Sequence, residues 1–226
     1  MPLNFRSECQ IHDSMGFSLY VITDRQQTDG RPLVEVVRLA LQGGVQAVQL
    51  REKDLPDKEL LELARSLRQV TTEFGAKLLI NRRIDICQAV NADGVHLGAE
   101  GVSITEAKQL LSERQLIGYS AHSMEEACAA EADGAHFVTF GPVYATPSKT
   151  FYGKPVGTGR LKDVCRVLTI PVFALGGIKR NSISEVLSAG ARGIALISAV
   201  IAAPDPTTEV QSLLHMIEEH AIHSGT

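Results

Sequence analysis

Eight short apolar runs, each followed by a longer stretch, constrain the fold of this chain more than any other feature. Near-continuous runs of Val, Ile and Leu are typical of parallel strands that are covered on both faces. In the stretches between them, residues such as Leu60, Leu63 and Leu67 recur at helical spacing. The alternation predicts an α/β protein with eight strands, at 19–22, 47–50, 77–80, 94–97, 116–119, 136–140, 172–175 and 193–197.

Two arrangements satisfy this alternation, a closed barrel and a doubly wound sheet. The count of eight favours the barrel, and so do similar glycine-containing phrases before four of the strands, where a glycine ends a helix in the left-handed conformation. These glycines are Gly44, Gly94, Gly134 and Gly190. The sequence therefore predicts an α/β fold, a single-domain (β/α)₈ TIM barrel over residues 18–226. Residues 1–17 are expected to form a flexible N-terminal extension.

Composition excludes several classes of partner. The formal net charge of -4 lacks the basic surplus that nucleic-acid binding needs. No apolar run approaches the roughly 20 residues that cross a bilayer. The cysteines form no Cys-x-x-Cys pair, which favours reduced thiols over a disulfide or a metal site. We expect a cytoplasmic protein with no nucleic-acid and no membrane partner, and the one protein partner considered is a second copy in a homodimer.

Polar side chains gather after strands 2 and 3, where barrel enzymes build their active sites. Period-two alternation puts Gln49, Arg51 and Lys53 on one face at the open end. Two positive charges beside an amide favour binding of an anionic substrate over a merely solvated loop. Asn81 offers both a donor and an acceptor after strand 3, and Arg82 follows it as a further cation.

His122 is the best candidate for proton transfer. It follows strand 5, while Ser123 and Glu126 have the spacing of a capping box that starts the next helix. The imidazole therefore stands at the mouth of the barrel, where a group that titrates near neutral pH suits acid–base catalysis better than packing. Ser120, just before it, is grouped with the substrate-binding residues. His96, inside strand 4, is interpreted as a core residue.

A phosphate site is predicted after strands 6, 7 and 8. The long loop 141–159 carries Thr146, Ser148 and Lys149, whose hydroxyls and ammonium suit phosphate oxygens. Loops after the last two strands form the usual phosphate site of this architecture, and helix N-termini there offer unpaired N–H groups. The residues at these two places are Gly176, Gly177, Ile197 and Ser198.

From Leu19 to Pro206 the chain resembles the thiamine phosphate synthases and the related thiazole tautomerases. The resemblance rests on Gln49-Leu50-Arg51-Glu52-Lys53, Ser120-Ala121-His122-Ser123, Thr146-Pro147-Ser148-Lys149 and Gly176-Gly177-Ile178, in this order. It implies a TIM barrel of thiamin biosynthesis that acts on a phosphorylated thiazole. In a synthase, the residues at 49, 51, 53 and 81 would contact the pyrimidine diphosphate, those at 146, 148 and 149 the phosphates, and those at 177, 197 and 198 the thiazole phosphate.

One departure bears on the reaction. The family pattern has Mg²⁺-binding aspartates where this chain has Arg82 and Gly101. Mg²⁺ prefers carboxylate oxygens, and Glu100 is the nearest carboxylate but stands out of register. We therefore expect no metal ligand and no cofactor. A metal-independent thiazole tautomerase, an isomerase with His122 as its catalytic residue, is the preferred interpretation.

Three alternatives remain open. The first is thiamine phosphate synthase, a Mg²⁺-dependent transferase that couples an aminopyrimidine diphosphate with thiazole phosphate. The second is a catalytically silent regulatory protein that binds a phosphorylated ligand. The third, an unrelated phosphate-binding barrel isomerase, does not account for the Gln-Leu-Arg-Glu-Lys and Thr-Pro-Ser-Lys motifs.

Overall fold

The eight predicted strands close into a barrel. The computed structural model describes residues 15–146 and 154–223. Every strand pairs in parallel with its neighbours in chain order, and β1 also pairs with β8, which closes the sheet. The strands are β1 Leu19–Ile22, β2 Ala47–Leu50, β3 Lys77–Asn81, β4 Gly94–Leu97, β5 Leu116–Ala121, β6 Phe137–Phe140, β7 Val172–Leu175 and β8 Gly193–Leu196. The (β/α)₈ TIM barrel is thus confirmed over the doubly wound sheet.

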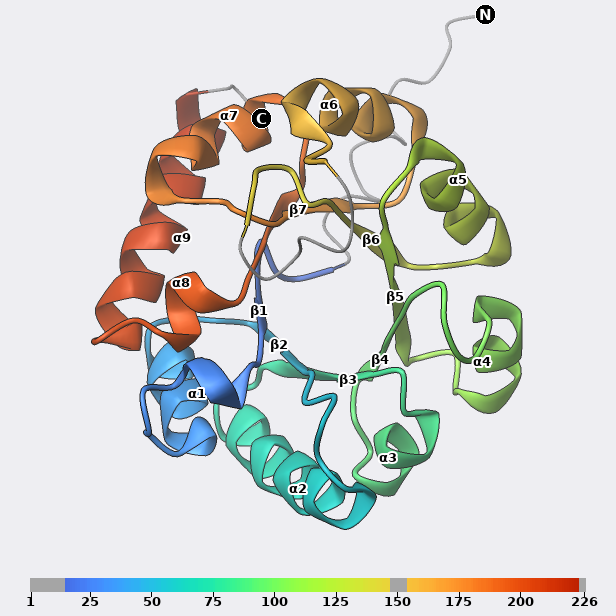
Figure 1. Ribbon diagram of the computed structural model, residues 1–226, viewed down its shortest axis with the longest axis vertical. Helices are drawn as coiled ribbons and strands as arrows, with labels where there is room; N and C mark the ends of the chain where they lie inside the picture. Colours follow the sequence, from blue (N-terminus) through green and yellow to red (C-terminus); the bar gives the residue numbers. More distant parts are fainter. Residues whose placement is uncertain (1–14, 147–153, 224–226) are drawn as a thin grey trace, which may run out of the picture.

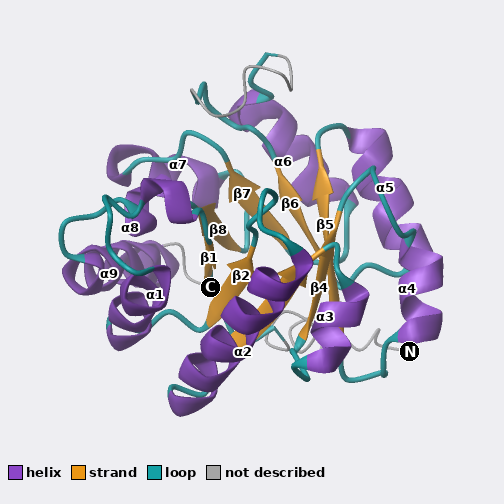
Figure 2. Cartoon of the chain, turned by 60° about the horizontal axis from the view of Figure 1, so that its bottom comes forward, coloured by secondary structure: helices purple, strands orange, loops and turns teal. Residues whose placement is uncertain are grey.

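Helices surround the strands, as Figure 1 shows along the shortest axis and Figure 2 in a tilted view. The longest, α9, packs against α1, α7 and α8. The helices are α1 Leu33–Gln42, α2 Asp57–Glu73, α3 Ile84–Ala89, α4 Ile104–Leu110, α5 Met124–Asp133, α6 Gly157–Val167, α7 Ile183–Ser188, α8 Ser198–Ile201 and α9 Pro206–His223, with short 3₁₀ helices η1 Arg25–Gln27 and η3 Arg180–Ser182.

Alternation along each strand divides the core into two parts. In β1, Leu19 and Val21 point outward and pack in the layer between strands and helices. Tyr20 points inward to a smaller cluster inside the barrel, where Phe17 stacks on Phe173 with ring centroids 5.0 Å apart. These apolar side chains fill the lower part of the barrel, and cavities remain at the carboxyl ends of the strands.

The glycine prediction is confirmed at three positions and wrong at the fourth. Gly44, Gly134 and Gly190 have positive φ, as expected of residues that end a helix. Before β4 the left-handed residue is Asn91, with φ of 50°. Gly94 instead is the first residue of β4. A glycine is needed there because a Cβ would stand 2.1 Å from the carbonyl oxygen of Leu116.

Residues near the predicted start of the barrel belong to its packed interior. Met15 and Phe17 are both buried, although they fall within the expected extension 1–17. Residues 1–14 lie outside the described ranges, so the boundary itself stays a prediction. Among the described residues, none of the helices combines the length and apolarity that spanning a bilayer requires.

Candidate active site

Two adjoining cavities open at the carboxyl ends of the strands. The first has a volume of about 130 Å³ and the second about 470 Å³. Leu175 and Ile197 line both, so a ligand in one lies beside a ligand in the other. The first is lined by the predicted residues Gln49, Arg51, Lys53, Asn81, Arg82, Ser120 and His122. The second is lined by Thr146, Gly176, Gly177, Ile197 and Ser198. Ser148 and Lys149 lie outside the described residues.

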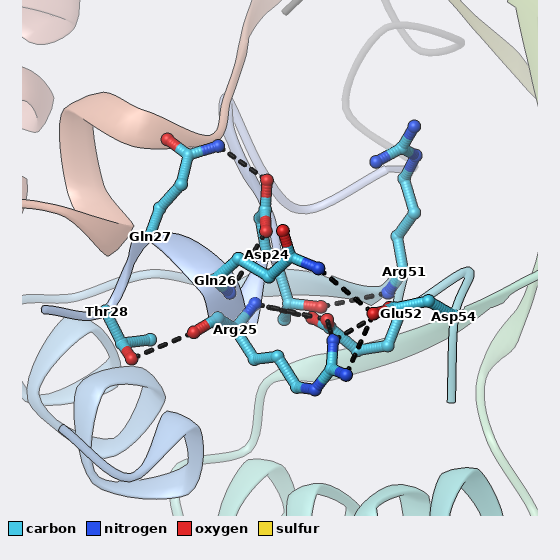
Figure 3. Close-up of polar contacts among 9 residues, drawn as sticks. Asp24, Arg25, Gln26, Gln27, Thr28, Arg51, Glu52 and Asp54 are labelled. Atoms are coloured by element: carbon cyan, nitrogen blue, oxygen red, sulfur yellow. Dashed lines mark hydrogen bonds and ion pairs between the residues drawn. The ribbon is translucent and has the colours of Figure 1, made fainter. Parts of the chain in front are cut away.

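A buried carboxylate fixes the segment that carries Arg51 and Lys53. Both oxygens of Glu52 accept the backbone N–H of Arg25 at 3.1 Å, which ties the end of β2 to the end of β1. The backbone N–H of Arg51 donates to the hydroxyl of Thr23 at 2.9 Å. Figure 3 shows the Arg51 side chain directed away from this network. Burial raises the pKa of Glu52, against hydrogen bonds from Thr23 and Arg25.

An ion pair supports the same corner from the surface. The guanidinium of Arg25 donates to Asp54 at 2.7 and 2.9 Å, and the Gln26 amide donates to Asp54 at 3.0 Å (Figure 3). These bonds connect the loop after β2 to η1. Within the described residues the Arg51 guanidinium makes no hydrogen bond or ion pair, and Arg51 lines the first cavity.

Inside the barrel, a chain of hydrogen bonds holds two of the cavity residues. The amide of Gln49 donates to the Tyr20 hydroxyl at 3.0 Å, and that hydroxyl lies 3.4 Å from His96 Nδ1. His96 Nε2 lies 3.0 Å from Ser120 Oγ. A buried amide needs such partners, and His96 is 2% exposed. His96 is therefore a core residue, as expected, that connects Gln49 with Ser120.

His122 is held at both its backbone and its ring. The predicted capping box forms in part. Ser123 Oγ accepts the backbone N–H of Glu126 at 3.1 Å, but the Glu126 carboxylate accepts from His122 N at 2.7 Å instead of from Ser123. His122 Nδ1 lies 2.5 Å from the Gly141 carbonyl oxygen. A carbonyl only accepts, so Nδ1 carries a hydrogen, and in the neutral ring Nε2 is the acceptor.

The glycine pair after β7 permits a close approach of two loops. Gly177 has φ of 66°, and a Cβ on it would stand 2.7 Å from the Ala145 carbonyl oxygen. The N–H of Tyr144 donates to the Gly176 carbonyl at 3.0 Å. The glycines thus bring Ala145 and Thr146 to the wall of the second cavity. The close contact between the two loops therefore explains the glycine at position 177 without reference to any ligand.

Four polar residues of the second cavity escaped the sequence reasoning: Gln27, Lys179, Arg180 and Glu209. Lys179 and Arg180 directly follow Gly176-Gly177-Ile178, and this position in the sequence could have indicated that they line the same cavity. Arg180 pairs with Glu209 of α9, a contact between segments far apart in the chain. Gln27 comes from η1 after β1, and nothing in its local sequence distinguishes it.

The first cavity does not offer a Mg²⁺ site. Where the family pattern has one aspartate, the guanidinium of Arg82 lies 2.8 Å from the Glu100 carboxylate. Gly101, at the second place, has no side chain. A dication about 5 Å from a guanidinium is repelled by roughly 7 kcal/mol at an effective dielectric constant of about 20. Over the described ranges, no three His, Cys, Asp or Glu side chains are grouped to hold a metal ion.

Comparison with known proteins identifies the family. The model described as "Thiamine monophosphate synthase" matches residues 19–200. The chain belongs to this family. A Geobacter sulfurreducens protein named "Putative thiamine-phosphate synthase" is 58% identical over 89% of this chain and 94% of its own. The thiamine-phosphate synthase of Shouchella clausii is 41% identical over 90% and 97%. The thiamine phosphate pyrophosphorylase structure from Pyrococcus furiosus has a TM-score of 0.82 and 40% identity, over 90% and 96% of the two chains.

These relatives overturn the preferred interpretation of the sequence. We expected a thiazole tautomerase, an isomerase, because both aspartates of the metal site are replaced. That prediction is wrong, since relatives that are 41–58% identical carry the name of the synthase, a transferase. Arg82 lines the first cavity, whereas Gly101 does not. The error was to infer a different reaction from a different set of charged side chains.

Proposed function

We propose that this chain is a thiamine-phosphate synthase. It joins an aminopyrimidine whose methylene carries a diphosphate to a thiazole phosphate. The bond between the methylene carbon and the diphosphate oxygen breaks, and its electron pair leaves with the oxygen. The lone pair of the thiazole nitrogen forms the new carbon–nitrogen bond. The products are thiamine phosphate and diphosphate, and the thiazole nitrogen needs no base because it carries no proton.

The observation that carries this proposal is the pair of adjoining cavities. The first cavity presents Arg51, Lys53 and Arg82, and the second presents Lys179 beside the backbone of Gly176 and Gly177, so each cavity offers donors to an anionic group. Because Leu175 and Ile197 belong to both, two anionic substrates bound there meet end to end. Such positioning replaces a bimolecular encounter by a reaction within one complex.

The first cavity suits the pyrimidine diphosphate. We assign diphosphate oxygens to Arg51 and Lys53, which stand on either side of the fixed Glu52. Asn81 and Gln49 present amides that pair with ring nitrogens and an amino group, since an amide both donates and accepts. Ser120, held by His96, adds a hydroxyl on the opposite wall. Leaving-group charge is then stabilised by groups already in place.

The second cavity suits the thiazole phosphate. We assign its phosphate to the backbone at Gly177 and to Ile197 and Ser198, where α8 begins. Thr146 lines this cavity, and Ser148 and Lys149, from the same motif, are assigned to the phosphates as well. His122, with Nδ1 committed to Gly141, is assigned a contact to substrate through Nε2. The coupling gives it no proton to remove from carbon, so its role here is binding. The cytoplasmic location and the homodimer stay predictions.

The test is to incubate the purified protein with both substrates and to detect thiamine phosphate by mass spectrometry. Product is expected only when both substrates are present. The reaction is run once in MgCl₂ and once in EDTA. Calorimetry should show that thiazole phosphate still binds when the first cavity is saturated with diphosphate. Binding of both ligands without product would identify the silent regulatory protein and would refute the synthase.

A further inference from the structure

We propose that Arg82 takes the place of the divalent cation in this chain, so that the first cavity binds diphosphate without a metal. This inference rests on the proposed function, because it assumes that a diphosphate enters the first cavity. It concerns the charged side chains that line this cavity. Three cations, Arg51, Lys53 and Arg82, line the cavity together with one carboxylate, that of Glu100.

The backbone at Arg82 is held in an unusual conformation. Its φ is 61°, a region where Asn and Asp are enriched and long side chains are uncommon. The Arg82 N–H donates to the His96 carbonyl at 3.0 Å, which fixes this conformation against β4. An arginine in this backbone conformation is strained, and such strain is found most often at functional sites. The guanidinium lies over Gly98, with Nη2 3.8 Å from the place of a Cβ.

Glu100 holds the guanidinium at the cavity without closing the site. The two groups are 2.8 Å apart, and the Glu100 side chain is 81% exposed. Ion pairs in contact with water are weak, so a diphosphate can displace the carboxylate from Arg82. Arg82 and, further off, Lys53 hold the pKa of Glu100 below its usual range. Glu100 is therefore ionised at neutral pH and opposes an anion in the same cavity.

A guanidinium performs part of what a metal ion performs toward a diphosphate. It presents a fixed fork of N–H donors that pairs with two phosphate oxygens, and it keeps its charge at every working pH. With Arg51 and Lys53 beside it, the leaving diphosphate meets three positive charges. The same three charges repel a dication that is not already bound to phosphate oxygens.

The test is calorimetric titration of the full-length protein with inorganic diphosphate, in EDTA and in MgCl₂. The wild-type Kd in EDTA is expected to lie within about threefold of that in MgCl₂. Arg82→Asn, which suits the positive φ, should raise the Kd in EDTA at least about tenfold. Arg83→Gln is the matched control. It removes the same charge from the next residue, whose guanidinium pairs with Asp57 and Asp85, and should change the Kd less than about twofold.

Glu100→Gln separates this account from a metal site. Loss of the opposing charge should tighten diphosphate binding several-fold in EDTA, whereas a metal ligand at Glu100 would make the variant bind more weakly in MgCl₂. Diphosphate binding that requires Mg²⁺, or an unchanged Kd for Arg82→Asn, would overturn the proposal. An unfolding midpoint no lower than that of the wild type, together with an unchanged thiazole phosphate Kd, excludes a folding defect in Arg82→Asn. Metal-free binding without product would count against the synthase and leave the role of Arg82 standing.

Discussion

Glu52 accepts the backbone N–H of Arg25 with both carboxylate oxygens, each at 3.1 Å, and so ties the loop after β2 to the loop after β1. Its carboxylate is nearly inaccessible to water. Glu52→Ala would leave the Arg25 N–H without this acceptor, and we expect the free energy of unfolding to fall by about 1–3 kcal/mol. Chemical denaturation measures the loss.

The same variant should also raise KM for the pyrimidine diphosphate, because Arg51 and Lys53 flank the removed anchor. Glu62→Ala, on the exposed surface of α2, serves as the control and should change neither quantity. If Glu52→Ala unfolds like the wild type, the buried carboxylate does not stabilise this corner.

Gly177 should tolerate no side chain. In Gly177→Ala the new Cβ would stand 2.7 Å from the Ala145 carbonyl oxygen and 2.8 Å from Tyr144 Cβ. The loop before α6 must then move, and we expect KM for thiazole phosphate to rise at least about tenfold with a loss of stability of about 1–3 kcal/mol. Steady-state kinetics and denaturation test both.

Gly75→Ala is a matched control for that experiment. Gly75 has the same φ of 66°, but no atom lies within 4 Å of its Cβ position. The control therefore carries the backbone strain without the steric clash. Equal effects of the two substitutions would show that the approach of Ala145 to Gly177 is unimportant.

His136 should make the fold sensitive to acid. Its Nδ1 accepts the backbone N–H of Ile117 at 2.9 Å, so the ring is neutral there. Burial and, next, Lys108 lower its pKa. The unfolded chain therefore binds the proton more readily, and the free energy of unfolding should fall as the pH drops below about 6.5, the ordinary histidine value.

Denaturation at a series of pH values tests this, and His136→Gln should flatten the slope below neutral pH. His215→Gln, at an exposed position on α9 where the ring lies 3.3 Å from the Glu219 carboxylate, should change the slope much less, because exposed ion pairs are weak. A wild-type slope in His136→Gln would mean that other groups cause the acid sensitivity.

The Tyr20 hydroxyl supports the pyrimidine side of the cavity from below. It accepts from the Gln49 amide at 3.0 Å inside the barrel. Tyr20→Phe would leave that amide without its acceptor, at a cost of about 1–3 kcal/mol. KM for the pyrimidine diphosphate should rise, while KM for thiazole phosphate stays unchanged. An equal rise in both would indicate general loosening of the barrel.

Local pattern was enough to predict most of the fold and much of the site. Period-two alternation places Tyr20 inside the barrel, and it places Gln49, Arg51 and Lys53 on one cavity wall. Such features depend on neighbours in sequence, which is why the sequence reveals them. The left-handed conformation of Asn91 was not predicted, because Gly94, three residues later, was expected to adopt it.

Contacts between distant segments escaped prediction. Glu52 stands between two cations in sequence and resembles a solvated residue, but its partner Arg25 is 27 residues away. The ion pair between Glu100 and Arg82 connects the ends of β3 and β4, a contact that the sequence alone does not show. The adjoining of the two cavities through Leu175 and Ile197 is likewise a property of the closed barrel that no local pattern shows.

The most direct test of the synthase is a single-turnover experiment with the protein in excess over the pyrimidine diphosphate. With thiazole phosphate present, diphosphate and thiamine phosphate should appear in equal amounts and at the same rate. Without thiazole phosphate, neither should appear. Diphosphate release that is independent of thiazole phosphate, or no release when both substrates are bound, would contradict the proposal that the two cavities join two substrates.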